Sequence, residues 1–385
     1  MGVKVVLFGV TSDFSKRLLG KIPEEMCRRG WQVHVVSSSG GPVEDAAQAT
    51  VVHHDLPMKR EPSIWQDFLA LVAWVKLIRK IGPDTVSLGT PKAALLGLLA
   101  ARLLMVPNRV YFLRGFRCET ETGARRTILL LAEAITAWCS TRVIAVSPSL
   151  RRIFLDHGLA TEGKVLSTFP GSSHGVDCNL FRPAEKGRGK SLDSAVLGIR
   201  VRDIPVIGFV GRYSIDKGSQ ELVALHKHLF QVGLDHELLI AGPIESSPEM
   251  VDALFESGRV PHILGAVQNI HEMLQACDLL VLPTHREGFP NAVLEANASG
   301  IPAITTSATG SVDSVIHRRT GLVVPLGNTT LFCLAVESLV RDRNMRVQMG
   351  ENALSWVRTN FQEDVKVNEI INLHFVDLPN VALQR

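Results

Sequence analysis

The alternation of short apolar runs with amphipathic segments is the feature that most restricts what this chain can fold into. Uninterrupted runs rich in β-branched residues are typical of strands buried on both faces of a parallel sheet. In the first half such runs predict strands at 3–8, 32–37, 85–88, 109–113 and 142–146. Helices are predicted at 13–29, 63–81, 92–105 and 124–139. Parallel strands joined by helices form right-handed βαβ units, so this half is predicted to be a doubly wound α/β domain.

The same alternation restarts after a polar, glycine-bearing and aperiodic break, which we interpret as a linker. Beyond it, strands are predicted at 206–210, 236–241, 278–283 and 302–305, and helices at 217–232, 269–276, 290–299, 328–341, 343–359 and 363–374. The predicted fold is α/β, with two doubly wound Rossmann-like domains facing across a cleft. Its parts are a first domain at 1–182, the linker at 183–203, a second domain at 204–360 and a helical segment at 361–385 that packs back on the first domain. Ligands of such domains bind beyond the carboxyl ends of the strands.

The distribution of charge separates the two halves. Residues 1–190 carry 26 Lys and Arg against 16 Asp and Glu, and residues 191–385 carry 15 against 22. A basic and an acidic half indicate that the two halves face different partners. Six cysteines without C-x-x-C spacing predict neither a zinc site nor a redox motif. The longest apolar stretch, 93–106, is too short to span a bilayer, so we expect a cytoplasmic protein, peripheral on the inner face of a membrane.

The first candidate site is the segment 208–218, which begins within a predicted strand. Gly211 lets a ligand approach the backbone, and the helix that follows offers free N–H groups and the positive end of its dipole to an anion. Arg212 and Lys217 are placed to hold a diphosphate through charge-assisted hydrogen bonds. An ordinary turn with two solvated basic side chains is the alternative interpretation.

The second candidate site is the segment 286–295. Glu287 lies in the loop after a predicted strand, and Glu295 lies eight residues further on, on the helical face of position 291. Both carboxylates can accept hydrogen bonds from sugar hydroxyls, while residues 289–294 offer helix N-terminal amides to a phosphate. A solvated carboxylate is the alternative for Glu295, although apolar neighbours indicate a buried helix, in which a carboxylate needs a partner.

Taken together, these segments resemble the family 4 retaining nucleotide-sugar glycosyltransferases, which have the two-domain GT-B fold. Glu287 and Glu295, with Gly288-Phe289-Pro290 between them, resemble the signature segment of that family. Gly211-Arg212 and Lys217-Gly218 resemble its phosphate-binding loop. Further segments are similar to its later motifs and to the bacterial capsular and exopolysaccharide subgroup: 90–93, 114–115, 119–120, 123, 146–150, 175–177, 309–313 and 320–323.

The resemblance implies a retaining hexosyltransferase that moves a sugar from a nucleotide diphosphate sugar, a UDP-sugar in our expectation, to a glycan acceptor carried on polyprenyl diphosphate. It implies that Arg212 and Lys217 bind the donor diphosphate and stabilise the leaving group. Glu287 would contact hydroxyls of the donor sugar, and Glu295 would bind the ribose hydroxyls. The donor site would be completed by Gly211, Gly288, Phe289, Pro290, Asn291, Val293, Leu294, Pro243 and Val267.

The resemblance also implies chemistry with no metal and no cofactor, the nucleotide sugar being a co-substrate. The sequence contains no Asp-x-Asp motif, and a cationic pair can offset the charge that develops on the departing phosphate. In the same-face attack favoured for the family, the phosphate oxygen takes the acceptor proton, so no protein base is required. Arg114, Glu119 and His174 are expected on the acceptor side. Gly89 and His174 stand where many relatives have His and Asn, so the acceptor side departs from the family pattern.

Basic residues accompany aromatic and aliphatic ones in the first half of the chain. The predicted helix 63–81 carries Trp65, Phe68 and Trp74, with Lys76, Arg79 and Lys80 near its end. Such combinations suit an anionic membrane surface or a lipid diphosphate. Helices that are amphipathic only because they pack on a sheet are the alternative. We expect peripheral membrane contact and no nucleic-acid partner, because no nucleic-acid module is present.

Four other functions are alternatives to sugar transfer. A nucleotide-sugar 2-epimerase or a phosphorylase has the same fold, but the spacing of Glu287 and Glu295 favours a transferase. A non-catalytic partner subunit is expected to lose Arg212, Lys217 or Glu295, and all three are present. A dinucleotide dehydrogenase is excluded because the loop that starts at Gly9 lacks the G-x-G-x-x-G pattern.

Overall fold

The computed structural model describes residues 3–38, 51–58, 63–184 and 204–376. The chain divides into two compact units, which are described separately. Unit 1 comprises Met1–His174 and Asp364–Arg385, and unit 2 comprises Gly175–Glu363. Most of the predicted linker, 185–203, lies outside the described residues.

Unit 1 is built on a seven-stranded sheet in which every neighbouring pair of strands is parallel. The strand order is β3-β2-β1-β4-β5-β6-β7. The strands are β1 (Val5–Gly9), β2 (Gln32–Ser37), β3 (Val51–Asp55), β4 (Thr85–Leu88), β5 (Asn108–Leu113), β6 (Arg142–Ala145) and β7 (Val165–Ser167). The order reverses direction between β1 and β4, as in a doubly wound fold.

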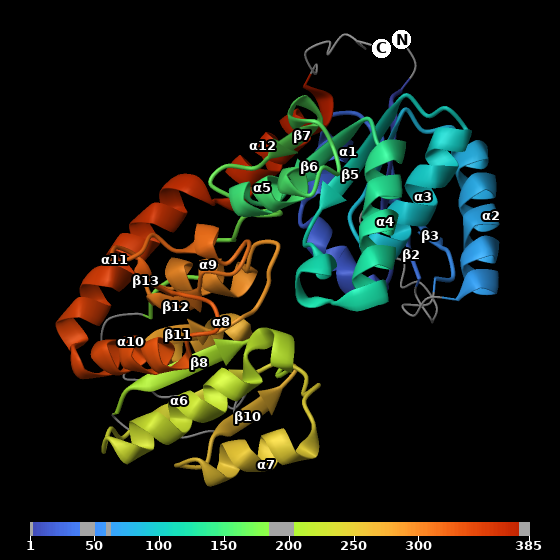
Figure 1. Ribbon diagram of the computed structural model, residues 1–385. Coiled ribbons are helices and arrows are strands. Elements are labelled where there is room, and N and C mark those ends of the chain that lie inside the picture. Colours follow the sequence, from blue (N-terminus) through green and yellow to red (C-terminus); the bar gives the residue numbers. More distant parts are fainter. Residues whose placement is uncertain (1–2, 39–50, 59–62, 185–203, 377–385) are drawn as a thin grey trace. The chain divides into compact units, whose positions relative to one another are not determined.

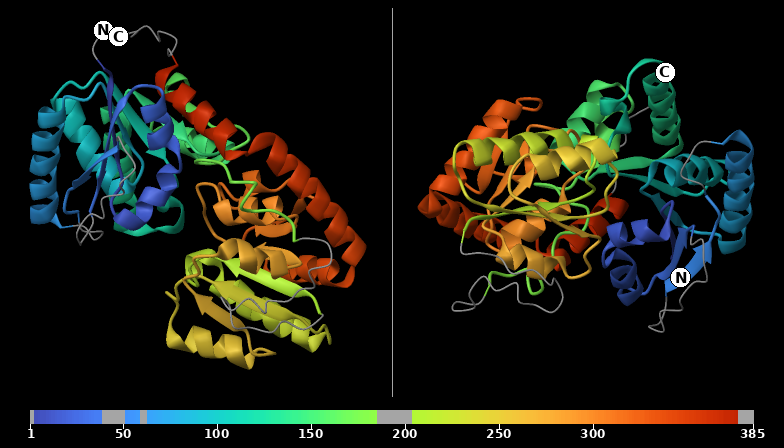
Figure 2. Two further views of the ribbon diagram at one scale, coloured as in Figure 1. Left: turned by 180° about the vertical axis from the view of Figure 1, so that it is seen from behind. Right: turned by 90° about the horizontal axis from the view of Figure 1, so that it is seen from below.

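Helices cover both faces of this sheet. On one face, α2 (Ile64–Ile81), α3 (Pro91–Leu103) and α4 (Gly123–Cys139) lie side by side (Figure 1). On the other face lie α1 (Ile22–Arg28) and α12 (Glu363–Phe375), as Figure 2 shows from behind. The helix α5 (Pro148–Asp156) packs against β6 and β7.

The last helix, α12, belongs to the core of unit 1 although it is the final described element of the chain. Its His374 is buried against the rings of Phe8 and Phe112, and its Nε2 lies 2.8 Å from the Ser87 hydroxyl on β4. Arg142 donates from Nη1 to the carbonyl of Leu373 at 2.9 Å. The sheet face of unit 1 is therefore completed by residues from the far end of the chain.

Unit 2 is a six-stranded, all-parallel sheet in the order β10-β9-β8-β11-β12-β13. Its strands are β8 (Val206–Val210), β9 (Glu237–Ala241), β10 (His262–Gly265), β11 (Leu279–Leu282), β12 (Ala303–Thr306) and β13 (Gly321–Val324). Its helices are α6 (Ser219–Gln231), α7 (Pro248–Glu256), α8 (Ile270–Ala276), α9 (Asn291–Ala298), α10 (Thr329–Arg341) and α11 (Arg343–Asn360). Helix α6 packs against α7 and α10, and α9 packs against α8 and α11 (Figure 1).

The predicted fold class, two doubly wound α/β domains, is confirmed, with differences in its elements. The predicted helix 13–29 is wrong: a 3-10 helix, η1 (Asp13–Leu19), precedes α1. Gly20 separates the two with φ 53°, and a Cβ there would lie 2.6 Å from the Cβ of His174. Only glycine fits this close turn, so a continuous helix cannot pass through it. The structure also contains elements that were not predicted, namely β3, β7, β10, β13, α5 and α7.

Candidate active site

Both sequence segments singled out above lie at the point where the strand order of unit 2 reverses. The segment 208–218 follows β8, and the segment 286–295 follows β11, which is the neighbour of β8 in the sheet. Loops at this reversal leave the carboxyl ends of the strands toward opposite faces, which is where doubly wound folds bind ligands. The parallel sheet therefore joins two segments that lie far apart in the sequence.

Three glycines hold these loops at backbone contact. A Cβ at Gly242, after β9, would lie 1.9 Å from the carbonyl oxygen of Gly211. One at Gly310, after β12, would lie 2.2 Å from the carbonyl oxygen of Gly288. One at Gly218, at the start of α6, would lie 2.3 Å from that of Pro283. Any side chain at these positions would push the loops apart.

Arg212 is held between two carboxylates. Its Nη1 donates to Glu245 at 2.5 Å, and its Nη2 donates to Asp216 at 2.9 Å. Burial lowers the pKa of Arg212, but Asp216 and Glu245 raise it, so that it lies above its ordinary value. Burial raises the pKa of Asp216, whereas the Ser214 hydroxyl and the charge of Arg212 bring it below its ordinary value. The guanidinium is thus fixed in orientation and fully charged.

Lys217 and Glu287 form the contact that joins the two loops. The ammonium group of Lys217 lies 2.5 Å from Oε1 of Glu287, and the two side chains are 15% and 17% exposed. The loop that carries Glu287 is itself fixed, because the amide of Glu287 donates to the carbonyl of Thr309 at 3.0 Å. All three predicted catalytic residues, Arg212, Lys217 and Glu287, therefore lie in the loops at the reversal point.

Charges of both signs alternate within this cluster. In addition to the hydrogen bond from Arg212, Asp216 accepts one from Nη2 of Arg286 at 3.5 Å. Its backbone carbonyl accepts from the amide of His285 at 3.0 Å. Each cation is therefore pre-positioned by a carboxylate, so the orientation of these donors is set by the fold.

The segment after Glu287 divides into backbone that can bind a ligand and side chains that belong to the core. Phe289 is 7% exposed and packs on the ring of Phe361 at 5.6 Å between centroids. Val293 and Leu294 are fully buried in α9, so their side chains pack in the core and are not donor-binding groups. Asn291, the first residue of α9, and Glu295, one turn later, are partly exposed. Pro290 is the N-cap of α9, and the first turn of a helix points its backbone amides toward the position that an anion can occupy.

Pro243 and Val267, predicted to complete the donor site, follow β9 and β10. The carbonyl of Pro243 accepts from the amide of Tyr213 at 2.9 Å, which ties this loop to the segment after β8. The amide of Gly242 donates to the carbonyl of Gly265 at 2.7 Å. Val267 is two residues beyond this contact and partly exposed. Both residues are therefore in loops attached to the one that carries Arg212.

The predicted acceptor residues are all in unit 1. Arg114 follows β5, Glu119 lies in the 3-10 helix η2 (Arg117–Thr120), and His174 ends the first stretch of unit 1. Burial and the nearby charge of Arg114 lower the pKa of His174 to about 4, and its Nδ1 lies 2.9 Å from the Ser173 hydroxyl. His174 is therefore a neutral, packed side chain. The structure brings Arg114 and His174 together and leaves Glu119 in a separate turn.

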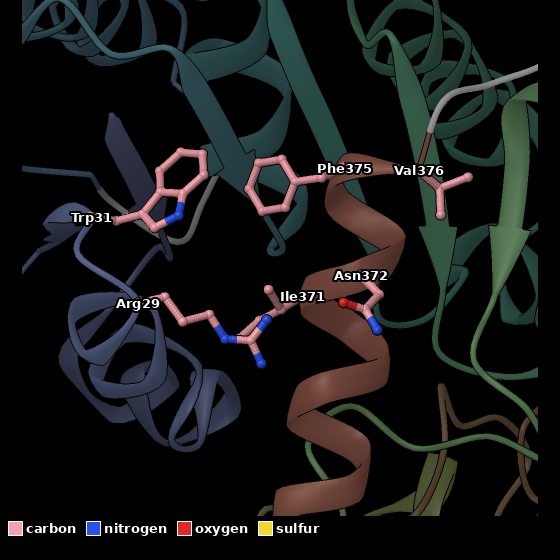
Figure 3. Close-up of a pocket in the computed structure, with 6 residues that line it drawn as sticks. All are labelled: Arg29, Trp31, Ile371, Asn372, Phe375 and Val376. Carbon is pink, nitrogen blue, oxygen red and sulfur yellow. The ribbon is translucent and has the colours of Figure 1, made fainter. Parts of the chain in front are cut away.

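A pocket on unit 1 lies apart from every predicted site residue (Figure 3). It is lined by Arg29, Trp31, Ile371, Asn372, Phe375 and Val376. Trp31 immediately precedes β2, and its ring lies 4.7 Å from that of Phe375 at the end of α12. The pocket is thus at the amino end of a strand, opposite to the edge where doubly wound domains bind ligands.

Two carboxylates and one arginine that organise the cluster, Asp216, Glu245 and Arg286, were not predicted as site residues. Asp216 and Arg286 each stand directly before a residue that was assigned a role. Each of them could have been found from the sequence, because each is the immediate neighbour of an oppositely charged residue that was assigned a role: Asp216 of Lys217, and Arg286 of Glu287. Glu245 carried no such signal, because it reaches Arg212 from the loop after another strand.

Among residues 3–38, 51–58, 63–184 and 204–376, no three His, Cys, Asp or Glu side chains are arranged to hold a metal ion. None of the helices described is both long and apolar enough to cross a bilayer.

Comparison with known proteins gives the class first. Residues 18–166 match the Glycosyl transferase 4-like domain, and residues 198–356 match Glycosyl transferases group 1. The chain therefore belongs to the family 4 glycosyltransferases, as its motifs predicted. Solved structures agree: the sucrose-phosphate synthase of Thermosynechococcus elongatus superposes with a TM-score of 0.79 at 18% identity, covering 96% of this chain and 98% of that one. The predicted GT-B fold is confirmed.

Three particular proteins resemble this chain over most of its length. The chain is 32% identical over 362 residues to the capsular polysaccharide biosynthesis glycosyltransferase CapM of Staphylococcus aureus, covering 91% of each chain. It is 27% identical over 354 residues to an Escherichia coli UDP-Gal:alpha-D-GlcNAc-diphosphoundecaprenol alpha-1,3-galactosyltransferase, covering 89% of each. The Anabaena protein HepE, solved with UDP and glucose, superposes with a TM-score of 0.76 at 16% identity, covering 96% of this chain and 99% of that one.

Proposed function

We propose that this glycosyltransferase is a retaining, metal-independent enzyme of bacterial surface polysaccharide synthesis. It transfers a hexosyl group from a UDP-sugar to a glycan carried on polyprenyl diphosphate. The observation that carries the proposal is the contact of Lys217 with Glu287 beside Arg212, at the reversal point of the unit 2 sheet. The E. coli relative uses a UDP-sugar and a diphosphoundecaprenol-linked acceptor, and a Staphylococcus aureus relative acts in capsule synthesis. These names support the choice of donor and acceptor.

The proposed reaction assigns a task to each of these side chains. The bond between the anomeric carbon and the diphosphate oxygen breaks, and the negative charge that develops is met by Arg212 and Lys217. The acceptor oxygen forms the new bond on the same face of the sugar, and its proton passes to the leaving phosphate oxygen. Glu287 accepts hydrogen bonds from hydroxyls of the donor sugar, and Glu295 accepts them from the ribose. No protein base takes part in this scheme.

The experiment that tests the proposal measures UDP release from a panel of UDP-sugars, with and without a prenyl diphosphate-linked acceptor. We expect release that depends on the acceptor and an α-linked product whose anomeric configuration matches the donor. EDTA should leave the rate unchanged. An epimerase would turn over the nucleotide sugar without an acceptor, a phosphorylase would require inorganic phosphate, and a partner subunit would give no turnover. Any of these three results would refute the proposal.

Peripheral contact with an anionic membrane is the second part of the proposal, and α4 carries it. Ile128, Leu131, Ile135 and Trp138 are 66%, 61%, 37% and 60% exposed. Their spacing of three, four and three residues places them on one face of the helix. A solvent-facing helix normally carries charged residues on that face, so this stripe is the reverse of the usual pattern.

The charges around the stripe indicate which surface it contacts. Arg125 and Arg126 are exposed at the start of α4, and the guanidinium of Arg102 lies 3.6 Å from the ring centroid of Trp138. The acidic residue of α4, Glu133, points inward, where it accepts a hydrogen bond from the Tyr111 hydroxyl at 2.8 Å. Exposed apolar side chains with arginines at both ends suit the interface of an anionic bilayer.

Flotation with phosphatidylglycerol vesicles and with phosphatidylcholine vesicles tests this contact. The wild type should float with the anionic vesicles at low salt only, and a Leu131→Glu/Trp138→Glu variant should remain with the free protein. Phe230→Glu, which changes a 64% exposed side chain on α6 in unit 2, serves as the matched control and should float like the wild type. Equal flotation of the wild type and the α4 variant would contradict the proposed surface.

A further inference from the structure

Arg114 is a half-buried cation, and two of its nitrogens have no hydrogen-bond partner. Its Nε and Nη1 are both inaccessible to solvent, and neither has a hydrogen-bond partner in the structure. No acidic side chain in the described part of the chain forms an ion pair with it. A buried guanidinium normally has a carboxylate or carbonyl oxygen on these donors, because leaving them unpaired costs free energy. Such an exception in a folded domain needs an explanation.

The surroundings hold the guanidinium in place. Its Cζ lies 4.3 Å from the centroid of the Phe112 ring, so the aromatic side chain supports the flat face of the cation. Gly89, at the carboxyl end of β4, makes room beside it, because a Cβ there would lie 2.7 Å from Nε. Stacking on Phe112 occupies the face of the guanidinium and leaves the N–H groups at its edge without acceptors.

The titratable groups near Arg114 do not neutralise it. His174 and His374 both have their pKa lowered to about 4, through burial and in part through the charge of Arg114, so both are neutral at pH 7. Burial lowers the pKa of Arg114 itself to about 9, and no carboxylate opposes this effect. The region therefore holds a charged, oriented donor group with no anion beside it.

Arg109, on the strand that Arg114 follows, shows what a structural arginine looks like here. Arg109 on β5 donates from Nε to the carbonyl of Cys139 at 2.7 Å and from Nη1 to the carbonyl of Val106 at 2.5 Å. Both of the corresponding nitrogens of Arg114 are without a partner. Arg109 therefore serves as a matched control for Arg114. The fold provides acceptors for Nε and Nη1 of Arg109, but not for those of Arg114.

We infer that Arg114 is the receptor for a phosphate oxyanion of a substrate, which takes up the donors that have no partner in the structure, Nε and Nη1. The inference rests on the proposed function, which supplies two diphosphates, one in the lipid-linked acceptor and one in the nucleotide sugar. A planar fork of donors fits two phosphate oxygens at once, and a buried guanidinium strengthens such a contact. Both sources present the same chemistry, and the experiment distinguishes them.

The test compares the wild type with Arg114→Met and Arg114→Lys, using one glycan on two carriers, a prenyl diphosphate and a neutral alkyl chain. If the acceptor supplies the phosphate, the wild type prefers the diphosphate carrier, and Arg114→Met loses this preference through a KM raised about 10- to 100-fold. If the donor supplies it, the KM of the nucleotide sugar rises by a similar factor with both carriers. Arg114→Lys should recover part of either loss, because it restores the charge without the fork.

The temperature of thermal unfolding distinguishes a binding role from a structural role. Removing a structural arginine lowers this temperature, whereas removing an unpaired arginine does not. Arg114→Met should unfold at the same temperature as the wild type or higher, since an unpaired buried charge is removed. Arg109→Met, the matched control, should unfold at a lower temperature and keep the wild-type carrier preference. Unchanged KM values for both substrates in Arg114→Met would overturn the inference. Absence of transfer by the wild type with either carrier would instead refute the proposed function.

Discussion

Removing the ammonium group of Lys217 is the most direct test of the site. In Lys217→Ala, the departing diphosphate loses one of two cations, and the Glu287 carboxylate loses the partner that lies 2.5 Å away. Deleting one preorganised charge-stabilising donor typically reduces kcat by about 10²-fold or more, which is about 2.7 kcal/mol of transition-state stabilisation. The ion pair is partly exposed, so its contribution to the free energy of unfolding should be within about 1 kcal/mol.

A double-mutant cycle separates the two roles that Lys217 can have. If the lysine acts on the phosphate, Lys217→Ala is slow whether residue 287 is Glu or Gln. If it serves only to position Glu287, then Glu287→Gln is as slow as the double variant, and removing the lysine costs nothing further. Single-turnover rates of donor consumption in the presence of acceptor give the required comparison.

The control is Lys227→Ala, which removes an exposed lysine from α6, the helix that begins two residues after Lys217. We expect the wild-type rate from this variant, because its charge is solvated. A Lys217→Ala enzyme that retains the wild-type rate, with its melting temperature unchanged, would refute the assignment of Lys217 to the leaving group.

Three further predictions concern binding, packing and pH. Glu295→Ala should weaken UDP binding by about tenfold in calorimetry, the loss expected for a hydrogen bond to a charged acceptor, and unchanged affinity would remove Glu295 from the nucleotide site. Asn297 is fully buried in α9 with both amide atoms unpartnered, so Asn297→Leu should raise the melting temperature by a few degrees; a fall would show that its polar atoms are needed. Burial lowers the pKa of His174, His226 and His374 to about 4, so the unfolded chain binds more protons below about pH 6.5, and stability should fall between pH 6.5 and 4. Denaturant unfolding at a series of pH values checks this sign, and flat or rising stability on acidification contradicts it.

The loops of the site were predictable because their position follows from topology. In a doubly wound sheet, the first strand becomes the neighbour of the strand at which the order reverses, as β8 and β11 do here. The loops that follow these two strands therefore lie next to each other. The resemblance placed Lys217 and Glu287 in one donor site, and the sheet brings them into contact although they lie 70 positions apart in the sequence. The ion pair between Arg212 and Glu245 could not be predicted from the sequence, because it depends on how far two side chains reach between loops and not on the order of strands and helices.

The elements that were missed have weak or ambiguous local signals. The strand β3 contains two histidines and lies at the edge of its sheet, where no continuous apolar run is required. The helix α5 had a readable start, since Pro148 occupies its first turn and the Ser147 hydroxyl accepts from the amide of Leu150 at 3.3 Å. That segment was interpreted as a family motif, and its capping pattern was not used.

The place of α12 in unit 1 has a consequence for how the protein is made. The chain leaves unit 1 after His174 and returns to it at Asp364, so the whole of unit 2 is an insertion within unit 1. On the ribosome, unit 2 can complete its sheet while one face of the unit 1 sheet still lacks the helix that buries Phe8 and Phe112. Until α12 emerges, the part of that face around these rings is exposed. The unit that begins to fold second can therefore complete its fold before the first unit does.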